Sequence, residues 1–485
     1  GAPWDGAGGA PGQGGAGGGG PPPAPGRESD SDPGAGDDFD RPVETPFVDT
    51  ADDPMSTFSV DIDTASYTYA RRALHEGRLP NPDSVRVEEF VNFFRYDDPA
   101  PEPDAAEPFS INLEAAPAPF GNDLHLLRVG IKGLEVPAID RDPANLVFLV
   151  DVSGSMQSPD KIGLVKYSLA QLTQALRPTD TLSIVTYAGA DRVLLEPTPI
   201  GDRTTVLDAI ESLAAGGSTA GAAGIRTAYD LAQSAFVEGG VNRVVLCTDG
   251  DFNVGLSGEP LVQLVESWRD RGITLTVLGY GQGNLNDAFL EQLTNRAEGQ
   301  YAYIDSRTEA LRVLGRDLVG TLQVIAKDVK IQLEFDPARV SRFRLVGYAN
   351  RVLNHEDFRD DTVDAGEIGS GHGVTAFYEI ELTGDAEPGL LATVRLRYKK
   401  PEGGDSAEVA RTLDTGAVHA ELTDASANLR FGAAVAELGE ILAQSTHSEG
   451  ARFEEVAELA QSAAFEDTDR QQFVELVNLA ETLWP

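Results

Sequence analysis

The chain has 485 residues and a formal net charge of −40, from 78 acidic and 38 basic side chains. Nucleic acid and anionic membrane surfaces are therefore poor partners, because both would repel such a chain. The length predicts two or three domains. No stretch approaches the ~18 consecutive apolar residues of a membrane span, so we do not expect the folded part to insert directly into a membrane.

Residues 1–50 are rich in Gly, Pro, Ala and Asp and hold few large apolar side chains. They cannot bury enough surface to offset the entropy lost on ordering, so we expect a disordered linker. It could be a tether that holds a domain away from a surface, or an inert tail. A cleaved signal peptide or lipidated leader would explain a start at Gly1 rather than Met, as would trimming of the chain.

Residues 51–140 combine helices with strands. A short strand near Phe58 leads into a first helix, for which Asp63 or Thr64 is the expected N-cap. A second helix over 85–94 carries its apolar side chains on one face. Two strands are then expected after a Pro-rich acidic connector, at 109–114 and 125–132.

The sequence Asn145-Leu-Val-Phe-Leu-Val-Asp-Val-Ser-Gly-Ser-Met156 joins a buried strand to a group of oxygen ligands. Its apolar run is typical of a strand buried on both faces in the centre of a parallel sheet. The strand ends at Asp151, and Ser153 and Ser155 follow. Ligands bind at the carboxyl ends of strands in open α/β sheets. One carboxylate and two hydroxyls there would supply half of a site for a hard cation.

Two downstream segments can supply the other half of this site. A second buried strand, Arg243–Thr248, ends in Asp249, and a loop of small residues over 216–221 carries Thr219. The order DxSxS, then a loop Thr, then a strand-end Asp resembles the metal-ion-dependent adhesion site (MIDAS) of von Willebrand factor type A (VWA) domains.

The resemblance implies one bound divalent cation, Mg²⁺ or alternatively Mn²⁺ or Ca²⁺. Its ligands would be Asp151, Ser153, Ser155, Thr219 and Asp249. It also implies a protein ligand that offers a carboxylate to the metal. A structural Ca²⁺ site of the EF-hand type is excluded, because the twelfth residue from Asp151 is Ile162 rather than Glu. Asp251, two residues past Asp249, is expected to cap a turn rather than to bind metal.

Three further segments, 57–67, 249–255 and 364–369, resemble signatures of a bacterial YfbK-like family. In this family a VWA domain lies between a characteristic N-terminal VWA-associated segment and a C-terminal domain of unknown function. The resemblance covers residues 51–485. It implies a periplasmic or cell-surface location, secreted or lipid-anchored through a removed N-terminus, and no assigned enzymatic reaction.

Residues 141–322 alternate apolar strands with amphipathic helices, which predicts a parallel, doubly wound sheet. Besides the two strands named above, strands are expected at 182–187, 274–280 and 301–304. Helices are expected at 160–176, 204–215, 220–237, 259–271, 286–297 and 308–321. No GxxxxGK[ST] motif occurs, so a nucleotide phosphate loop of that type is absent. The single cysteine, Cys247, is expected to be a buried core thiol.

Residues 323–411 predict strands at 327–335, 342–348, 374–382 and 391–398, and residues 412–485 predict helices at 420–444, 451–463 and 468–482. The two strands before the VWA region and the four after it would together make two packed layers. The expected fold class is therefore α/β: a doubly wound VWA domain inserted in or flanked by a β-sandwich, with a C-terminal helical segment.

The function we expect is a metal-dependent protein-binding, adhesion or scaffold module of the bacterial cell envelope. The alternative is a cytosolic VWA adaptor of a MoxR- or chelatase-type AAA+ ATPase, since VWA domains also partner ring ATPases. A metallohydrolase comes last, because no obvious His or Glu base accompanies the metal residues. We therefore expect no enzyme activity.

Overall fold

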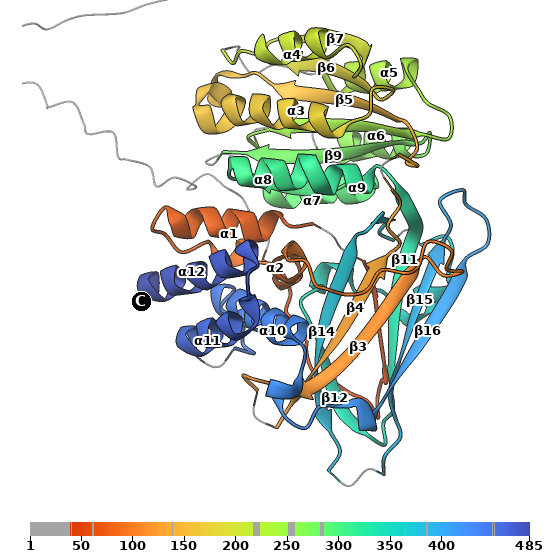
Figure 1. Ribbon diagram of the computed structural model, residues 1–485, viewed down its shortest axis with the longest axis vertical. Helices are drawn as coiled ribbons and strands as arrows, with labels where there is room; N and C mark the ends of the chain where they lie inside the picture. The colour runs from red at the N-terminus through yellow and green to blue at the C-terminus, as the bar shows by residue number, and fades with distance from the viewer. Residues whose placement is uncertain are drawn as a thin grey trace, which may run out of the picture.

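The computed structural model describes residues 39, 41–60, 63–121, 123–137, 139–216, 224–250, 258–281, 286–363, 365–384, 387–448, 450 and 452–485. These residues form three packed parts, which Figure 1 shows as an α/β domain at the top, a β-sandwich at the lower right and a helical cluster at the lower left.

A six-stranded sheet in the order β10-β9-β8-β5-β6-β7 forms the centre of the α/β domain. Its strands are β5 (Ala144–Asp151), β6 (Thr181–Tyr187), β7 (Asp191–Pro199), β8 (Val241–Thr248), β9 (Ile273–Tyr280) and β10 (Tyr301–Ile304). All neighbours pair in parallel except β7, which runs antiparallel to β6 at one edge. The central strand β5 is buried along its whole length.

Helices cover both faces of this sheet, which is why β5 is apolar on both sides. Leu146, Phe148 and Val150 enter a core with α3, α4 and α8. Val147 and Leu149 enter a second core with α5, α6 and α7. The helices are α3 (Leu164–Ala175), α4 (Arg203–Glu211), α5 (Gly224–Ser234), α6 (Glu259–Arg269), α7 (Asp287–Arg296), α8 (Arg307–Arg312) and α9 (Leu318–Thr321), with π-helical turns at Pro159–Gly163 and Val313–Asp317.

The β-sandwich consists of two antiparallel sheets that share one apolar core. The first has the order β1-β12-β14-β4-β3, with β1 (Val48–Asp49), β12 (Val340–Val346), β14 (Gly373–Leu382), β4 (His125–Gly133) and β3 (Phe109–Pro117). The second has the order β13-β11-β15-β16, with β13 (Ile368–Gly369), β11 (Val324–Phe335), β15 (Leu390–Lys399) and β16 (Ala407–Asp414), and β2 (Met55–Ser59) pairs with β11.

The α/β domain is inserted in this sandwich. β3 and β4 precede it in the sequence, yet β4 pairs with β14, which follows it. The chain returns through α9, which ends only a few residues before β11 begins (Figure 1). The two crossings lie together, because the Gln323 side chain accepts a hydrogen bond from the Asp142 backbone N at 2.8 Å. The predicted fold class is confirmed.

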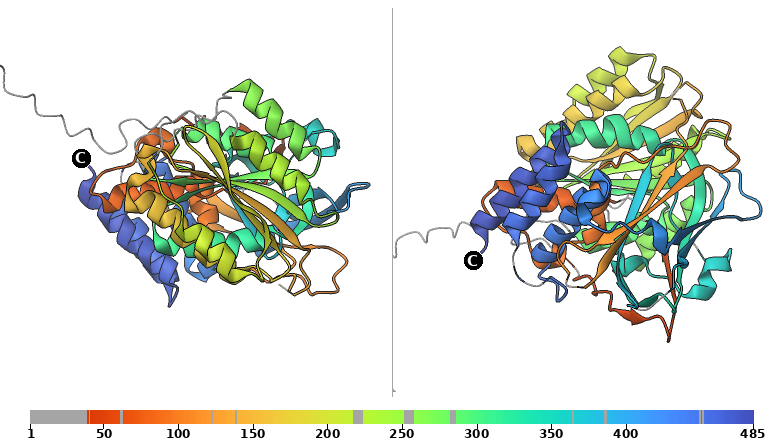
Figure 2. Two further views of the ribbon diagram at one scale, coloured as in Figure 1. Left: turned by 90° about the horizontal axis from the view of Figure 1, so that it is seen from above. Right: turned by 60° about the horizontal axis from the view of Figure 1, so that its bottom comes forward.

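Five helices from both ends of the chain form the helical cluster. They are α1 (Ala65–His75), α2 (Val87–Phe93), α10 (Ala427–Leu442), α11 (Phe453–Ala464) and α12 (Thr468–Leu483). Tyr67 and Phe90 from the N-terminal segment share one core with Phe431 and Phe473 from the C-terminal helices. Both views of Figure 2 show the blue C-terminal helices beside the orange α1 and α2.

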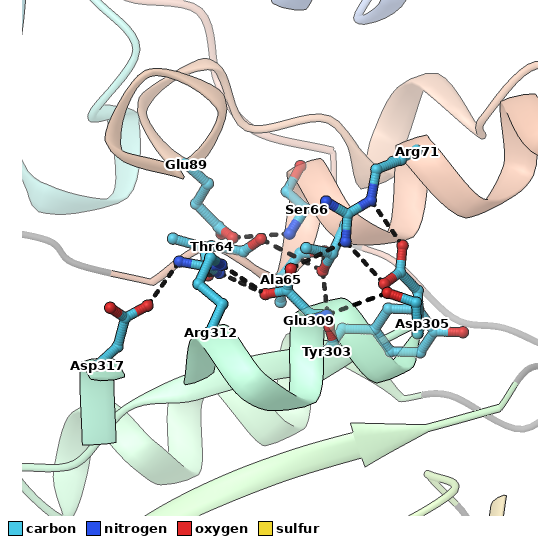
Figure 3. Close-up of polar contacts among 12 residues, drawn as sticks. Thr64, Ala65, Ser66, Arg71, Glu89, Tyr303, Asp305, Glu309, Arg312 and Asp317 are labelled. Atoms are coloured by element: carbon cyan, nitrogen blue, oxygen red, sulfur yellow. Dashed lines mark hydrogen bonds and ion pairs between the residues drawn. The ribbon is translucent and has the colours of Figure 1, made fainter. Parts of the chain in front are cut away.

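Buried ion pairs join α1 to the α/β domain (Figure 3). Arg71 on α1 donates to both carboxylate oxygens of Asp305 at 2.7 Å and to Glu309 at 2.9 Å. Glu309 also pairs with Arg312, which donates to Asp317 at 2.7 Å. Each of these three carboxylates therefore has an arginine partner, and α1 is fixed between the α/β domain and α12.

Residues 41–50 correct the predicted linker over 1–50. β1 pairs with β12, and the Thr50 backbone N donates to the Ser341 carbonyl at 3.0 Å. Composition misled here, because pairing with a neighbouring strand and packing of Val48 on the sandwich core hold this segment. Residues 1–38 and 40 lie outside the described residues.

Several elements differ from the sequence prediction. β7 and β16 were not predicted, and β7 makes the α/β sheet mixed rather than wholly parallel. The helix expected over 420–444 begins at Ala427, because Ser426 Oγ accepts from Leu429 N at 3.1 Å and caps it. The helix expected over 308–321 contains a π-helical turn at Val313–Asp317. The helix expected over 220–237 is described from Gly224 onward.

The expected cap of α1 is also corrected. Thr64 occupies the N-cap position, but its side chain makes no capping hydrogen bond. Its hydroxyl instead accepts from Arg312 at 3.0 Å, while Asp63 accepts from the Tyr301 backbone N at 2.8 Å. Glu89 accepts from the Ser66 backbone N at 2.8 Å and satisfies a donor of the first turn. Contacts between distant segments thus replace the local cap.

Candidate metal centre

Asp151 lies at the carboxyl end of β5, and its side chain is fully buried. Oδ1 accepts a hydrogen bond from the Ser153 backbone N at 2.8 Å, and Oδ2 accepts one from the Tyr187 hydroxyl at 3.2 Å. The strand register pairs Val150 with Cys247 on β8. Asp151 and the acid that follows β8, Asp249, therefore come to the same edge of the sheet.

The two hydroxyls of the DxSxS motif lie side by side. Ser153 Oγ is 2.9 Å from Ser155 Oγ. Ser153 is buried and Ser155 is exposed, and Ser155 lies in a short 3₁₀ turn, Gly154–Gln157, that follows β5. The motif therefore presents neutral oxygen atoms between a buried carboxylate and the surface.

Asp249 is fully buried, and its two carboxylate oxygens have different surroundings. Oδ2 accepts a hydrogen bond from Lys161 Nζ at 2.9 Å. Oδ1 is buried and makes no hydrogen bond to any of the described residues. A buried acceptor without a donor is costly, and buried polar atoms nearly always have a partner. This oxygen therefore fits a cation or another ligand at the site.

The electrostatics of the site also fit a cation. Burial raises the pKa of Asp151 to about 6, and the charge of Asp249 adds to this rise while hydrogen bonds from Ser153 oppose it. Burial likewise raises the pKa of Tyr187, and the negative charge of Asp151 adds to that rise. Two buried carboxylates that repel each other attract positive charge.

The donor set is that of a hard divalent ion. It consists of carboxylate and hydroxyl oxygens, which suit the near-octahedral coordination of Mg²⁺ completed by water. Within the part of the chain that the structure describes, no group of three or more His, Cys, Asp or Glu side chains is arranged to hold a metal. A site based on many carboxylates or on histidines is therefore not present in that part.

The structure brings Asp151, Ser153 and Ser155 together and places Asp249 at the same sheet edge. Thr219, the fifth predicted ligand, lies in 217–223, outside the described residues, and so does Asp251. Cys247 is buried as predicted, and burial raises the pKa of its thiol to about 12. It is therefore a core residue rather than a nucleophile.

The sequence prediction missed Lys161. This residue lies ten positions after Asp151, in the π-helical turn Pro159–Gly163 that precedes α3. A helix that follows a strand-end loop begins at the same sheet edge as the loop. A basic residue in its first turn could therefore have been recognised as a neighbour of Asp151 and Asp249.

Comparison with protein families matches three parts of the chain. Residues 34–128 match a family described as "von Willebrand factor", and residues 145–316 match the von Willebrand factor type A domain. Residues 320–483 match "Uncharacterized protein YfbK, C-terminal". The chain is also 38% identical over 467 residues to "Uncharacterized protein YfbK" of Escherichia coli (strain K12), covering 90% of this chain and 80% of that protein.

The chain belongs to the YfbK family of VWA-domain proteins. The chain is also similar to "Uncharacterized protein sll0103" of Synechocystis sp., which is 29% identical over 197 residues, covering 41% of this chain and 46% of that protein. Among solved structures, a von Willebrand factor type A protein from Catenulispora acidiphila is 17% identical with a TM-score of 0.44, and the match covers 78% of this chain and 91% of that one.

The VWA domain indicates a protein-interaction module. None of the described helices of this YfbK-family chain is both long enough and apolar enough to cross a membrane.

Proposed function

We propose that this YfbK-family protein is a metal-dependent protein-binding module, of the adhesion or scaffold type, in the bacterial cell envelope. One Mg²⁺, or alternatively Mn²⁺ or Ca²⁺, would be held by Asp151, Ser153, Ser155, Thr219 and Asp249. The observation that carries the proposal is the buried Oδ1 of Asp249, which has no donor among the described residues and lies at the sheet edge that also holds the Asp151 carboxylate.

The ligand set supports recognition of an acidic partner. A cation bound mainly by neutral hydroxyls keeps an unsatisfied positive field. Ser155 is exposed, so an ion beside it would be open to a carboxylate from another protein. We therefore propose that an Asp or Glu side chain of the partner completes the coordination shell.

Titration calorimetry with Mg²⁺ and with Mn²⁺ tests the metal site. We expect one site in the wild-type chain and at least about 100-fold weaker binding in Asp151→Ala, because a charged ligand is lost. Asp142→Ala, which removes a carboxylate at the opposite end of the domain, is the matched control. Equal metal binding by wild type and Asp151→Ala would refute the assignment.

A pull-down from envelope extracts with and without EDTA tests the partner. The partner should be retained only with metal and only by the wild-type chain, and circular dichroism should show that EDTA leaves the protein folded. Retention that survives chelation contradicts the proposal. Metal-dependent turnover of ATP or phosphate esters that Asp249→Ala abolishes would contradict the proposed lack of enzyme activity.

Cell fractionation tests the proposed location. The Gly- and Pro-rich N-terminal residues support a tethered, extracytoplasmic domain that is secreted or lipid-anchored. We expect the native protein in the envelope or periplasmic fraction. Recovery from the cytosol in complex with a ring ATPase would instead support the adaptor function.

A further inference from the structure

Lys161 places a positive charge on a carboxylate of the candidate metal centre. Its Nζ lies 2.9 Å from Asp249 Oδ2. The lysine side chain is 12% exposed and the aspartate is fully buried, so solvent screens this ion pair only weakly. The lysine therefore neutralises the carboxylate whose other oxygen, Oδ1, is proposed to bind the metal.

The route of the Lys161 side chain to Asp249 is fixed by packing on Gly281. A Cβ atom added at Gly281 would lie 2.1 Å from Lys161 Cε and 2.7 Å from Cγ. Gly281 also has a φ of +76°, a conformation that side chains disfavour. The lysine stem therefore occupies space that only a glycine at position 281 leaves open.

Helix α1 holds the turn that carries Lys161. Arg72 Nη2 donates to Asp160 Oδ2 at 2.8 Å, and Asp160 is the residue before Lys161. Arg72 Nη1 donates to the Tyr303 hydroxyl at 3.0 Å, and that hydroxyl donates to the Gly281 carbonyl at 2.6 Å. One arginine of the N-terminal segment thus fixes both the turn that bears the lysine and the glycine on which it lies.

We propose that Lys161 is a tethered cation that competes with the divalent metal for Asp249, and that α1 holds it in the competing position through Arg72. This inference rests on the proposed metal site. A metal ion that binds Asp249 has to displace the ammonium group, because two adjacent cations repel each other. Metal affinity is thereby linked to the docking of α1, and the linkage is reciprocal.

The competition has a consequence for regulation. α1 also packs on α12, so a partner that moves the helical cluster would loosen Arg72 from Asp160. That release would free Lys161 and strengthen metal binding, although Arg72 lies 79 positions before Asp151, the first proposed ligand. The N-terminal segment is in this sense an autoinhibitory element of the metal centre.

Titration calorimetry with Mn²⁺ on the full chain tests the competition. Lys161→Met keeps most of the apolar stem and removes the charge, and we expect it to bind Mn²⁺ at least about tenfold more tightly than wild type. Lys166→Met is the matched control, because Lys166 lies on α3 and pairs with Glu211 rather than with the site. Its affinity should equal that of wild type.

A double-mutant cycle tests the role of α1. Arg72→Met should strengthen Mn²⁺ binding when Lys161 is present and should have no effect in the Lys161→Met background. Arg78→Met is the control for the change of charge, because Arg78 lies in the same N-terminal segment and pairs with Glu76 at 2.7 Å. Equal effects of Arg72→Met in both backgrounds would overturn the role of α1.

The outcomes separate this inference from the proposed function. If wild type binds Mn²⁺ and Lys161→Met binds it equally or more weakly, Lys161 is not a competitor, and the metal site stands. If neither binds Mn²⁺, both the metal site and the competition are refuted. If Lys161→Met is too unstable to titrate, Lys161→Gln is the second variant, and it should also bind Mn²⁺ more tightly than wild type.

Discussion

Two groups of buried carboxylates in this molecule are built differently. At the junction of α1 with the α/β domain, Asp305 and Glu309 face Arg71, and Glu309 also faces Arg312. At the carboxyl edge of the sheet, Asp151 receives only neutral donors, and Asp249 receives one ammonium group while its Oδ1 has no donor among the described residues.

The difference indicates which buried acids are structural and which form a site. Buried charges persist where partners and hydrogen bonds compensate them. The carboxylates at α1 have such partners within the chain, so their role is to dock one segment on another. Those at the sheet edge are short of positive charge, which is the condition that a bound cation would relieve.

The largest expected effect comes from removing an arginine that pairs with the buried carboxylates at α1. Arg71→Met leaves Asp305 without its bidentate partner, and it should lower the local free energy of opening of α1 by about 3–5 kcal/mol. Hydrogen exchange of the α1 backbone amides measures this opening. Arg411→Met, which breaks an exposed pair with Glu107 on the sandwich, should change it little. If Arg71→Met lowers the free energy of opening of α1 by less than about 1 kcal/mol, the carboxylates at α1 do not depend on their arginine partners as proposed.

Neutralising one acid in each group should have opposite effects in the metal-free protein. Asp305→Asn weakens two hydrogen bonds from Arg71 and should destabilise the protein by about 2 kcal/mol. Asp151→Asn removes the repulsion from Asp249 and should be neutral or stabilising. Denaturant unfolding in EDTA measures both changes. Destabilisation by Asp151→Asn of the same size as by Asp305→Asn would contradict the distinction.

The same contrast predicts a dependence on pH. The pKa of Asp151 rises from 3.8 to about 6 on folding, so the folded state binds this proton more tightly than the unfolded state does. The stability that Asp151 contributes is therefore fully present below about pH 4 and is lost as pH rises through about 6, by about 3 kcal/mol. Unfolding of wild type and Asp151→Asn in EDTA across pH 4–7 should show the difference, and parallel profiles would refute it.

The smallest expected effect concerns the hydroxyl of Tyr187. Tyr187→Phe removes the hydrogen bond to Asp151 Oδ2 at 3.2 Å but keeps the ring that packs in the core. We expect about fivefold weaker Mn²⁺ binding, which corresponds to about 1 kcal/mol for one hydrogen bond. Tyr229→Phe, at another buried tyrosine whose hydroxyl has no hydrogen-bond partner among the described residues, is the control and should bind as wild type does.

Much of the fold was predictable because its signals are local. Each of two apolar runs ends in an acid, Asp151 and Asp249, which predicted two strand ends at one sheet edge. The register of β5 with β8 places them there. The pairing of β4 with β14, which follows the insertion, was expected from the need to cover exposed edges. Local pattern and burial agree in these elements.

The remaining features depend on contacts between distant segments. Arg71 and Arg72 look like exposed charges on an amphipathic helix, and only the packed structure shows that they face Asp305 and Asp160. β7 escaped prediction because an edge strand is half exposed and its alternation is weak. Lys161 belongs to the site through an ion pair with a residue 88 positions away, which no local pattern contains.

The insertion of the α/β domain affects how the chain is made. β4 ends at Gly133, and β11 begins at Val324, so the ribosome has to deliver residues 134–323 before the sandwich can close. At ~5–20 residues per second this takes about 10–40 s. During that interval the β3–β4 hairpin has no partner strand, and an unpaired hairpin is open to aggregation. The inserted domain can complete its own sheet in the same interval, which keeps the waiting hairpin attached to an already folded body.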